Sequence, residues 1–333
     1  MDDRIPAAPP VILSIEDGEE RPLWSVMIPT FNCIHYLRQT LSSVLTQDPG
    51  AGNMQIEVID DCSTDGDVGA LVQAIGKGRV SFFRQEKNRG SLRNFETCLN
   101  RSRGKWVHIL HGDDCVKPGF YQEIEHLFNS YPSVGAAFTK HSVINERGYE
   151  IEISGNIIEE PGIVKDWLYK IAQEVCVQPP AIVVKRSVYE HLGGFFAVHY
   201  GEDWEMWTRI AAHYPVAYSP KCLAMYRRHS NNISTRAFLS GQNTKDVMTV
   251  MNIIQSYLPR DKRRRIRQQA LRTYSIYFIK KSYYSFDEGK NVKAALRQAT
   301  NALKMHVNKI TVYNTIKLYI LYMLRRAVKE NSA

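Results

Sequence analysis

Short apolar runs alternate with amphipathic stretches between residues 24 and 110. Each apolar run ends at a turn or polar residue, which is typical of a buried strand. On this basis, strands are predicted at residues 24–28, 56–60, 80–83 and 105–110. The stretches between them repeat apolar residues at helical spacing, as at Leu37, Leu41, Val44 and Leu45. This alternation predicts an α/β fold with a parallel sheet and helices on both of its faces.

The pattern becomes less regular after Pro118 and changes again near Asp246. Further strands are predicted at residues 134–139, 181–184, 216–219 and 223–226, with a hairpin or loop at 148–162. From Asp246 onward only helical periodicity remains, in one stripe at Val247, Val250, Met251, Ile254 and Leu258 and another at Val292, Ala295, Leu296, Ala299 and Leu303. A helical region is therefore expected to follow the α/β part.

Polar residues follow the predicted strands at positions 29–32, 61–65 and 111–114. Parallel strands bring their carboxyl ends to one rim, where ligands bind in open α/β sheets. Asn32 is also expected to cap the helix that follows it. The third place contains Asp113 and Asp114, whose charges repel each other unless a cation neutralises them. It is a candidate site for a hard metal ion with a phosphate ligand, although an isolated pair is more often a solvated turn or a helix cap.

Two common nucleotide-binding patterns are missing from the chain. No GxGxxG follows the first strand and no Walker A motif occurs, so a Rossmann dehydrogenase and a P-loop NTPase both fit poorly. The first loop is instead Pro29-Thr30-Phe31-Asn32, which offers a hydroxyl, an aromatic face and an amide. Such a loop suits a nucleobase or ribose, and a plain strand-to-helix turn explains it equally well.

The composition of the 333-residue chain limits the cellular compartment and the kinds of partner that are expected for it. Residues 1–20 lack the pattern of a signal peptide, and no run of about 18 apolar residues suggests a membrane span. Six cysteines are scattered without a CxxC pair, which favours reduced thiols in a cytoplasmic protein over zinc or a disulfide scaffold. Residues 240–333 contain 19 Lys and Arg against 5 Asp and Glu, whereas the rest contains 24 against 29. This asymmetry suggests two regions, one of them with an anionic partner.

Six motifs in one order connect these observations. They are VMIPTFN (26–32), EVIDDCSTD (57–65), NRGSLRN (88–94), HILHGDD (108–114), GEDWEMWTR (201–209) and YRRHSNNIS (226–234). Together the motifs resemble those of family 2 inverting glycosyltransferases, over about residues 22–235. The resemblance implies the GT-A nucleotide-diphospho-sugar transferase fold, a mostly parallel sheet flanked by helices, at 22–238. A loosely held N-terminal arm is expected at 1–21 and a basic α-helical C-terminal region at 239–333.

The resemblance assigns a nucleotide-sugar donor to the first loops. Residues Pro29 to Asn32 are expected along the nucleoside. Asp61 is expected to accept a hydrogen bond from the base, with uracil N3–H as the donor; capping of the next helix is the structural alternative. Arg93 is expected to reach the base or the diphosphate, since a planar guanidinium suits a phosphate. A surface position on its helix is the alternative for Arg93.

The resemblance also implies a metal site at Asp113 and Asp114, with Asp114 as the direct ligand and Asp113 also near the donor. Many relatives carry an aspartate where this chain has His111, so fewer carboxylates hold the ion. Mg²⁺ or Mn²⁺ is expected, bound through few protein oxygens plus the diphosphate. His229 is expected to add an imidazole ligand or a phosphate contact, and an ordinary loop histidine is the alternative.

Asp203 is the expected general base for the acceptor hydroxyl, with Glu202 as the alternative base. A free aspartate is a weak base at a pKa of about 3.9, so burial beside Trp204 and Trp207 helps only if it raises that value. Simple helix capping is the structural explanation for Asp203. Glu202 and Trp204 are also expected beside the acceptor.

The implied reaction is a metal-assisted single displacement from a UDP-sugar to a saccharide or lipid-linked acceptor, in surface polysaccharide or glycolipid synthesis. A nucleotidyltransferase is the second candidate, but it is expected to carry a glycine-rich basic loop after the first strand. A nucleic-acid-binding protein is the third, yet no RNP, KH or zinc-finger signature occurs and no nucleic acid is expected. The basic C-terminal region is either a solvated face or a peripheral contact with an anionic membrane at the inner face.

Overall fold

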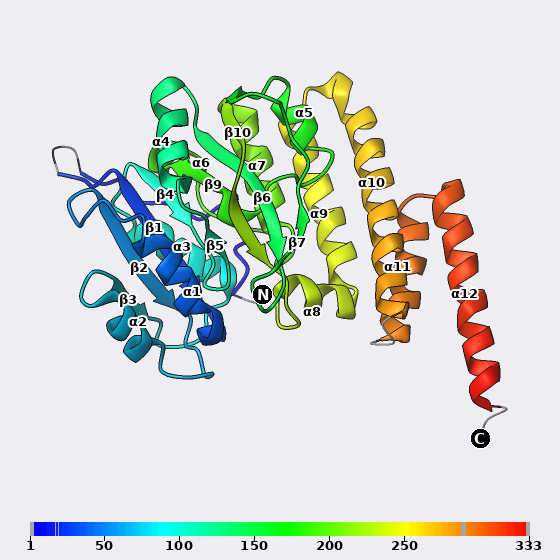
Figure 1. Ribbon diagram of the computed structural model, residues 1–333. Helices are drawn as coiled ribbons and strands as arrows, with labels where there is room; N and C mark the ends of the chain where they lie inside the picture. Colours follow the sequence, from blue (N-terminus) through cyan, green and yellow to red (C-terminus); the bar gives the residue numbers. More distant parts are fainter. Residues whose placement is uncertain (1–2, 17, 19, 288–290, 331–333) are drawn as a thin grey trace. The chain divides into compact units, whose positions relative to one another are not determined.

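The computed structural model describes residues 3–16, 18, 20–287 and 291–330 (Figure 1). The chain forms two units. The sheet unit comprises Met1–Trp167 and Cys176–His229, and the helical unit comprises Leu168–Val175 and Ser230–Ala333. The border after His229 lies nine residues before the boundary expected from the sequence at 238/239. Each unit is described separately.

Strands of the described part of the sheet unit form one sheet in the order β3-β2-β1-β4-β9-β6-β10-β5, with β7 on β6 and β8 on β10. Their bounds are β1 Trp24–Thr30, β2 Met54–Asp60, β3 Ser81–Arg84, β4 Trp106–Ile109, β5 Cys115–Val116, β6 Ala136–Ile144, β7 Glu150–Ile153, β8 Gly162–Ile163, β9 Ile182–Lys185 and β10 Val216–Arg227. The first four strands are parallel, as predicted.

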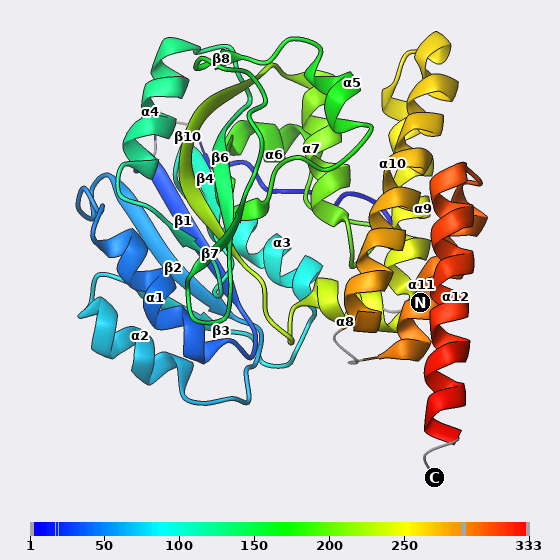
Figure 2. The same cartoon turned by 45° about the vertical axis from the view of Figure 1, so that its right-hand side comes forward.

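Helices cover both faces of this sheet (Figure 2). Helices α1 (Ile34–Leu45), α2 (Val68–Gly76) and α4 (Phe120–Ser130) lie on one face, where Trp106 and His108 of β4 stack on Phe128 and Phe120 of α4. Helices α3 (Ser91–Arg101), α6 (Arg186–Leu192) and α7 (Glu202–His213) lie on the other. Helix α5 (Trp167–Ile171) and the 3₁₀ turn η1 (Pro179–Ala181) complete the connections. Strands β1 and β4 between these layers are fully buried, whereas β3 and β7 at the margins are largely exposed.

The strand register brings the polar loops to one edge. Thr30, the last residue of β1, is aligned with Asp60 at the end of β2, and Asp60 is aligned with Arg84 at the end of β3. Beyond β4, the Gly112 amide donates to the Pro29 carbonyl at 3.0 Å. The rim predicted from parallel strands is therefore present.

The second half of the sheet differs from the prediction. Strand β9 runs antiparallel to both β4 and β6, so the sheet is mixed rather than parallel throughout. The two strands expected at 216–219 and 223–226 are one strand, β10, with an irregular register between Ser219 and Ala224. Pro220 lies in this irregular segment, where its missing amide hydrogen is tolerated. The loop or hairpin expected at 148–162 contains β7, which pairs with β6.

The described residues of the N-terminal arm are held by the sheet unit, contrary to the expectation of a loose arm. Its backbone carbonyls at Pro6 and Pro10 accept hydrogen bonds from the amides of Ala197 and Gly194, at 3.0 and 2.8 Å. Ile12 is buried. In these contacts, backbone groups of the arm bond to the sheet unit instead of to water. The polar, proline-rich composition of the arm does not reveal these partners, so the prediction of a loose arm was wrong.

The helical unit contains α8 (Ile233–Ser240), α9 (Gln242–Tyr257), α10 (Arg260–Asp287), α11 (Val292–Met305) and α12 (Lys309–Glu330). The predicted C-terminal helical region is thus present. Members of both predicted stripes are buried, namely Val247, Val250, Met251, Ile254, Ala295 and Ala299. Helix α11 packs against α10, and α12 packs against both. Within the described ranges, no helix combines the length and the apolar composition that crossing a bilayer requires.

Candidate active site

Asp61 joins two of the polar loops at the rim. One oxygen of its carboxylate accepts from the Arg89 amide at 2.6 Å, and the other accepts from the Gly90 amide at 2.8 Å and Asn88 Nδ2 at 2.9 Å. Gly90 makes this possible with a φ of 86°, a left-handed conformation that glycine adopts without steric cost. The predicted cap role is not seen, because Asp67 caps α2. Asp61 instead positions the NRG turn beside the expected donor site.

The first loop exposes one of its predicted donor-binding side chains. Phe31 is 40% exposed, whereas Pro29 and Thr30 are buried. The Thr30 hydroxyl donates to the Ile28 carbonyl at 3.3 Å. A nucleoside at this loop therefore has an aromatic face available at position 31, with two buried residues behind it.

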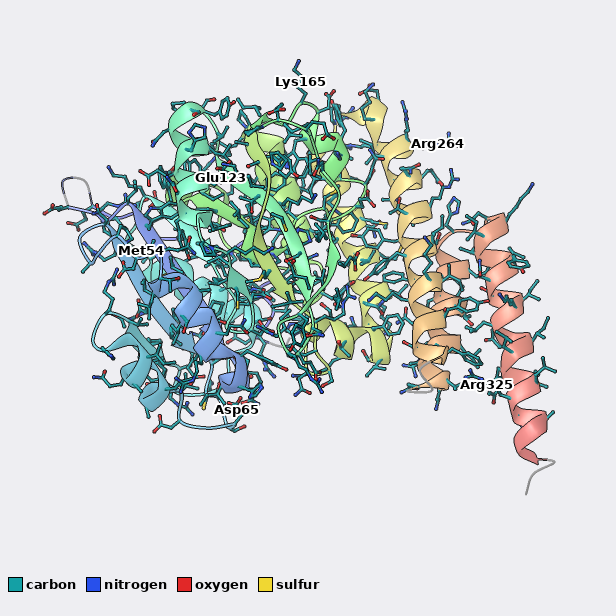
Figure 3. All side chains as sticks on the ribbon, viewed as in Figure 1. Met54, Asp65, Glu123, Lys165, Arg264 and Arg325 are labelled. Atoms are coloured by element: carbon teal, nitrogen blue, oxygen red, sulfur yellow. The ribbon has the colours of Figure 1, made fainter. Side chains whose placement is uncertain are left out.

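Asn32 does not cap α1 as predicted. Its backbone is left-handed, with a φ of 49°, and its Oδ1 accepts from the Thr64 amide at 2.8 Å. The Ile34 amide at the start of α1 donates to Asp65 Oδ2 at 2.9 Å instead. Figure 3 labels Asp65 at the rim. The reason is geometric, because the left-handed turn directs the Asn32 side chain toward the neighbouring loop.

Gly112 brings the loop after β4 into contact with β1. A Cβ atom at this position would lie 2.7 Å from Thr30 Oγ1 and 2.9 Å from Cys33 Sγ, which is closer than side chains pack. The Gly112 carbonyl accepts from Thr40 Oγ1 at 3.0 Å. The glycine is therefore required for a close approach of two backbones, and the following carboxylates are fixed by it.

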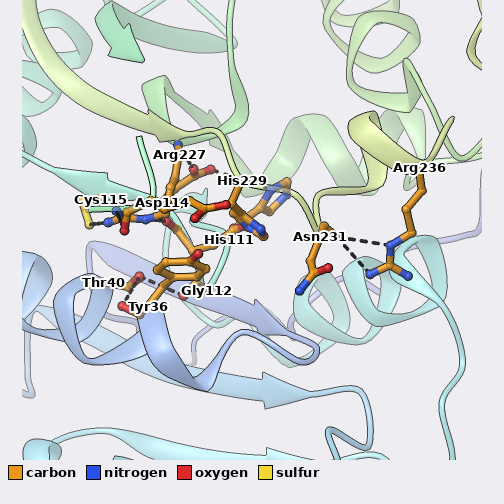
Figure 4. Close-up of polar contacts among 12 residues, drawn as sticks. Tyr36, Thr40, His111, Gly112, Asp114, Cys115, Arg227, His229, Asn231 and Arg236 are labelled. Carbon is orange, nitrogen blue, oxygen red and sulfur yellow. Dashed lines mark hydrogen bonds and ion pairs between the residues drawn. The ribbon is translucent and has the colours of Figure 1, made fainter. Parts of the chain in front are cut away.

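Asp114 lies together with His111 and His229 (Figure 4). His229 Nε2 is 2.8 Å from Asp113 Oδ2. Asp114 is 1% exposed, and its Oδ1 accepts from the Arg227 amide at 2.8 Å. Its Oδ2 has no hydrogen-bond partner among the residues that the structure describes, and His111 Nδ1 lies 3.9 Å from it. One buried carboxylate oxygen is thus left for a ligand that the protein does not supply.

The electrostatics of this pair favour a bound cation. Burial, and then the charge of Asp113, raise the pKa of Asp114 well above its usual range. Burial also acts to raise the pKa of Asp113, but the hydrogen bond from His229 and the nearby His111 lower it overall. Burial lowers the pKa of His111, which favours the neutral imidazole that a metal ion binds. A divalent ion would offset the repulsion between the two carboxylates.

His111, Asp113 and Asp114 form the donor set for such an ion. Each offers one ligand atom, and these atoms lie within 4.8 Å of one another. Opposite ligands of an octahedral Mg²⁺ lie about 4 Å apart, so a small contraction closes the set around one ion. An imidazole and two carboxylates, one of them with an unpartnered oxygen, fit Mg²⁺ or Mn²⁺. His111 is a candidate ligand that sequence reasoning missed, although its place in HGDD, two and three residues before the carboxylates, signalled it.

Arg227 is a second residue that sequence reasoning missed. Its side chain is fully buried, with Nε donating to the Asp113 carbonyl at 2.7 Å and Nη2 donating to Gln39 Oε1 at 2.6 Å. Its guanidinium carbon lies 4.8 Å from the Tyr36 ring centroid. Because its amide also donates to the Asp114 carboxylate, Arg227 fixes the backbone of Asp113 and the side chain of Asp114. The sequence signal that could have identified Arg227 was the basic run 227–229 directly after the strand predicted at 223–226.

Asp203 lies in the first turn of α7, after Gly201, whose φ is 88°. Its Oδ1 accepts from the Trp204 amide at 2.7 Å. Burial raises the pKa of Asp203 to about 6, which is the condition set above for a useful base. Glu202 is 9% exposed, and Trp204 is fully buried in the core.

A chain of aromatic rings connects α7 with the carboxylate pair. Trp207, one turn after Asp203, meets Phe195 edge-on with centroids 5.9 Å apart. Phe195 contacts Phe95 of α3 at 5.3 Å, and Phe95 stacks on His111 at 5.2 Å with an interplanar angle of 7°. Side chains four residues apart share a helix face, so Asp203 projects from the face of α7 that carries this chain.

Arg93 is engaged away from the carboxylate pair. Its guanidinium bonds Asp3 of the arm, with Nη2–Oδ1 at 3.1 Å, and Glu96 one turn later on α3, with Nη1–Oε2 at 2.8 Å. A contact with the donor requires a change of these partners. The role implied for Arg93 by the resemblance stays a prediction.

A family model describing glycosyl transferase family 2 matches residues 25–193. The chain belongs to this family. The match contains the loops at the ends of β1, β2 and β4 and the HGDD segment, so the family region includes the donor set assembled above. The chain is therefore a glycosyltransferase.

Relatives and solved structures agree with the family. An uncharacterized protein of Mycobacterium tuberculosis is 27% identical over 69% of this chain and 75% of its own length. A putative teichuronic acid biosynthesis glycosyltransferase of Bacillus subtilis, TuaG, is 26% identical over 67% of this chain and 86% of its own. The crystal structure of S. aureus TarS residues 1–349 with UDP-GlcNAc aligns with a TM-score of 0.64 at 14% identity, over 89% of each chain. The architecture of this family 2 enzyme is the GT-A fold.

Proposed function

We propose that this glycosyltransferase moves a sugar from a nucleotide-diphosphate sugar, a UDP-sugar, to a hydroxyl acceptor with inversion at the anomeric carbon. The observation that carries the proposal is the buried Asp113–Asp114 pair, whose Asp114 Oδ2 has no partner among described residues. A buried oxygen of this kind costs free energy unless it is satisfied by a ligand. A diphosphate-bound divalent ion supplies that ligand and accounts for two carboxylates side by side.

The donor nucleotide is assigned to the rim built by residues 29–32, Asp61 and Arg93. The exposed ring of Phe31 suits stacking on a base, and Asp61 Oδ1 accepts one protein hydrogen bond, which leaves capacity for the base. Solved structures of TarS hold UDP-GlcNAc and UDP, which supports a uridine nucleotide for this chain as well.

His111, Asp113 and Asp114 would hold Mn²⁺ or Mg²⁺, with His229 either a further ligand or the residue that orients Asp113. When bound, the ion stabilises the negative charge that develops on the leaving diphosphate. A histidine that hydrogen-bonds a ligating carboxylate fixes its direction, and such partners contribute measurably to metal affinity. The 2.8 Å contact between His229 and Asp113 supports the orienting role.

Asp203 is the proposed general base. As the acceptor oxygen bonds to the anomeric carbon, the bond from that carbon to the diphosphate oxygen breaks and the hydroxyl proton passes to the Asp203 carboxylate. One displacement from the face opposite the leaving group inverts the configuration. A pKa of about 6 keeps Asp203 ionised at neutral pH yet more basic than a free aspartate. Glu202 is the alternative base, and Trp204 is assigned to support of the acceptor side.

The acceptor is assigned to saccharides or lipid-linked saccharides of surface polysaccharide or glycolipid synthesis. TuaG is named as a putative teichuronic acid biosynthesis glycosyltransferase, and the match spans 86% of its length, which supports this setting. We assign the enzyme to the cytoplasm, with the basic helical unit at the inner face of a membrane. Free cysteines and the excess of 19 basic over 5 acidic residues after position 239 support this location.

Thermal unfolding with UDP-, GDP- and dTDP-sugars, each with Mn²⁺, Mg²⁺ or EDTA, tests the donor assignment. The expected result is a rise in Tm for UDP-sugars that depends on the metal. A rise of equal size for all three nucleotides, or one that EDTA does not remove, contradicts it. NMR of the product formed from the stabilising donor then gives the anomeric configuration, and retention contradicts the single displacement.

A further inference from the structure

Helix α12 is apolar on the face that the helical unit leaves exposed. Its packed side carries Thr311, Thr315 and Leu318, all buried against the neighbouring helices. The opposite side carries large apolar residues that are each 42–64% exposed, namely Ile310, Tyr313, Ile316, Tyr319, Ile320, Met323 and Leu324. We call these seven residues the outer stripe. Their spacing of three and four residues places most of them along one face of a straight helix.

A solvent-facing helix surface is normally polar, so the outer stripe needs an occupant. Contiguous exposed apolar patches of this kind mark surfaces that bind a partner or a membrane. In the sequence, the cations of α12 are Lys309, Lys317, Arg325, Arg326 and Lys329, and its only acidic residue is Glu330 at the last position. An apolar stripe bordered by basic residues is typical of a helix that lies in the interface of an anionic bilayer.

A basic pocket of about 690 Å³ opens at the N-terminal end of the same helix. Its lining residues are Arg265, Gln268, Gln269 and Arg272 of α10 with His306, Asn308, Lys309 and Ile310, and none of these is acidic. Arg265, Arg272 and Lys309 form no ion pair in the described part of the chain. The pocket therefore gathers three permanent cations without a carboxylate, which fits a phosphate group.

The pocket and the outer stripe share one side of α12. Lys309 precedes Ile316 by seven residues, which is two helical turns, and Ile310 belongs to both features. Asn308 holds this end of the helix, since its Oδ1 accepts from the amides of Ile310 and Thr311 at 3.0 and 3.1 Å. A phosphate bound in the pocket would therefore lie beside an apolar surface, as the headgroups of a bilayer lie beside its acyl layer.

We propose that the helical unit docks on an anionic phospholipid surface, with α12 in the membrane plane, its outer stripe among the acyl chains, and a lipid phosphate in the pocket. Helices of this type bury their apolar face about 5–10 Å into the boundary between headgroups and acyl chains. The proposal extends the membrane contact suggested above to named residues. It does not depend on the sugar-transfer chemistry.

Flotation of the full chain with vesicles tests the docking. Vesicles of phosphatidylcholine alone are compared with vesicles containing 30 mol % phosphatidylglycerol, at low and high salt. We expect binding to the anionic vesicles, reduced but not abolished by salt because the apolar contact persists. Equal recovery with both vesicle types contradicts docking on an anionic surface, and complete loss of binding at high salt contradicts insertion of the outer stripe.

The outer stripe is tested by the triple substitution Ile316→Ser, Ile320→Ser and Met323→Ser. These side chains are exposed, so folding is retained and the partition coefficient is expected to fall at least about tenfold. The control is Ile233→Ser with Leu239→Ser, which removes exposed apolar residues from α8 and is expected to leave binding unchanged. If both variants bind equally, the stripe is not the docking surface.

The pocket is tested by Arg265→Gln with Arg272→Gln against Arg260→Gln with Arg264→Gln. All four arginines lie on α10 and each pair removes two charges, but only the first pair lines the pocket. Figure 3 shows Arg264 projecting from α10. Loss of two cations near an anionic surface weakens binding by roughly 30-fold, and we expect the pocket pair to lose at least about fivefold more than the control pair. Equal losses contradict a phosphate site.

Light scattering in the absence of vesicles separates the bilayer from a second copy of the chain. A monomer is expected, unchanged by the outer-stripe substitutions. A dimer that these substitutions dissociate assigns the stripe to self-association and overturns the proposal. Transfer to a soluble acceptor is expected to be the same for all variants, so failure of docking and failure of the proposed transferase activity give different results.

Discussion

Burial acts on both acidic sites of the sheet unit, but with different consequences. At the end of β4, Asp113 and Asp114 are adjacent, and the second has a raised pKa because burial and a like charge act together. At the start of α7, burial is the largest cause that raises the pKa of Asp203, to about 6. The adjacent carboxylates at 113 and 114 favour binding of a cation, whereas the raised pKa of Asp203 favours acceptance of a proton. The same residue type is thus assigned to two roles by its neighbours.

The largest effect is expected for Asp203→Asn. An amide keeps the shape of the side chain but accepts no proton, so kcat should fall by about 10²–10⁴-fold. Metal-dependent binding of the donor, measured by calorimetry, should be unchanged. Glu202→Gln is the control and should retain most activity. Normal turnover of the Asp203 variant, or a larger loss for the Glu202 variant, would remove the contrast between the two sites.

Asp114→Asn should give the complementary result. Loss of a metal ligand removes several kcal/mol of charge stabilisation, or about 10³-fold in rate, and it should also abolish the metal-dependent rise in Tm with the donor. Asp203→Asn leaves that rise intact, so the two variants separate binding from proton transfer. An Asp114 variant that still binds the donor in a metal-dependent way would show that the ion lies elsewhere.

His229→Gln should weaken metal affinity by about 10–100-fold, with a much smaller change in kcat at saturating metal, because the histidine orients Asp113. Titration of activity with Mn²⁺ measures this split. The neighbouring Arg228→Gln, which alters a side chain bonded to Glu152 at 3.4 Å, is the matched control and should leave metal affinity unchanged. Loss of kcat at all metal concentrations would instead indicate direct participation in catalysis.

The pH dependence of kcat/KM sharpens the assignment of Asp203. The base must be ionised, and burial raises its pKa to about 6, so the rate should fall as pH drops through that value. Activity at pH 5 is expected to be about tenfold below the plateau at saturating metal. The residual rate of Asp203→Asn should lack this limb. An identical limb in the variant would assign the titration to another group.

The smallest effect is expected for His111→Asp, which restores the carboxylate that many relatives are expected to carry. An oxygen ligand in place of imidazole should shift preference from Mn²⁺ toward Mg²⁺ by a few-fold. The ratio of activities with the two metals measures this shift. The substitution leaves the length of the loop after β4 and the close contact at Gly112 unchanged. An unchanged ratio would indicate that position 111 does not contact the ion.

The sequence predicted the early part of the fold well because short apolar blocks and helical stripes are local signals. Strands β1 to β4 and their parallel alignment follow from them. The antiparallel direction of β9 did not, because a four-residue apolar strand reads alike in either direction. The interruption at Pro220 looked like a strand boundary, whereas the sheet absorbs it as a register irregularity within β10.

The site was predicted in part for the same reason. Asp113 and Asp114 stand out as adjacent carboxylates after a strand, and Asp203 stands out within a motif. Asn32 was assigned to the wrong partner, because its left-handed backbone turns the side chain toward residue 64. The arm at residues 1–21 was expected to be loose. This expectation failed because the carbonyl contacts that hold the arm involve residues about 190 positions away, which a local pattern does not show.

The sequence by itself determined which residues form strands and helices and where acidic side chains follow a strand. Those properties depend on each residue and its near neighbours along the chain. Only the tertiary structure decided that Arg227 holds the Asp113 carbonyl and the Asp114 carboxylate, that His111 completes the donor set, and that the outer stripe of α12 is exposed. Arg227 and Asp114 are 113 residues apart, and a contact over that distance is fixed by the packing of the whole sheet.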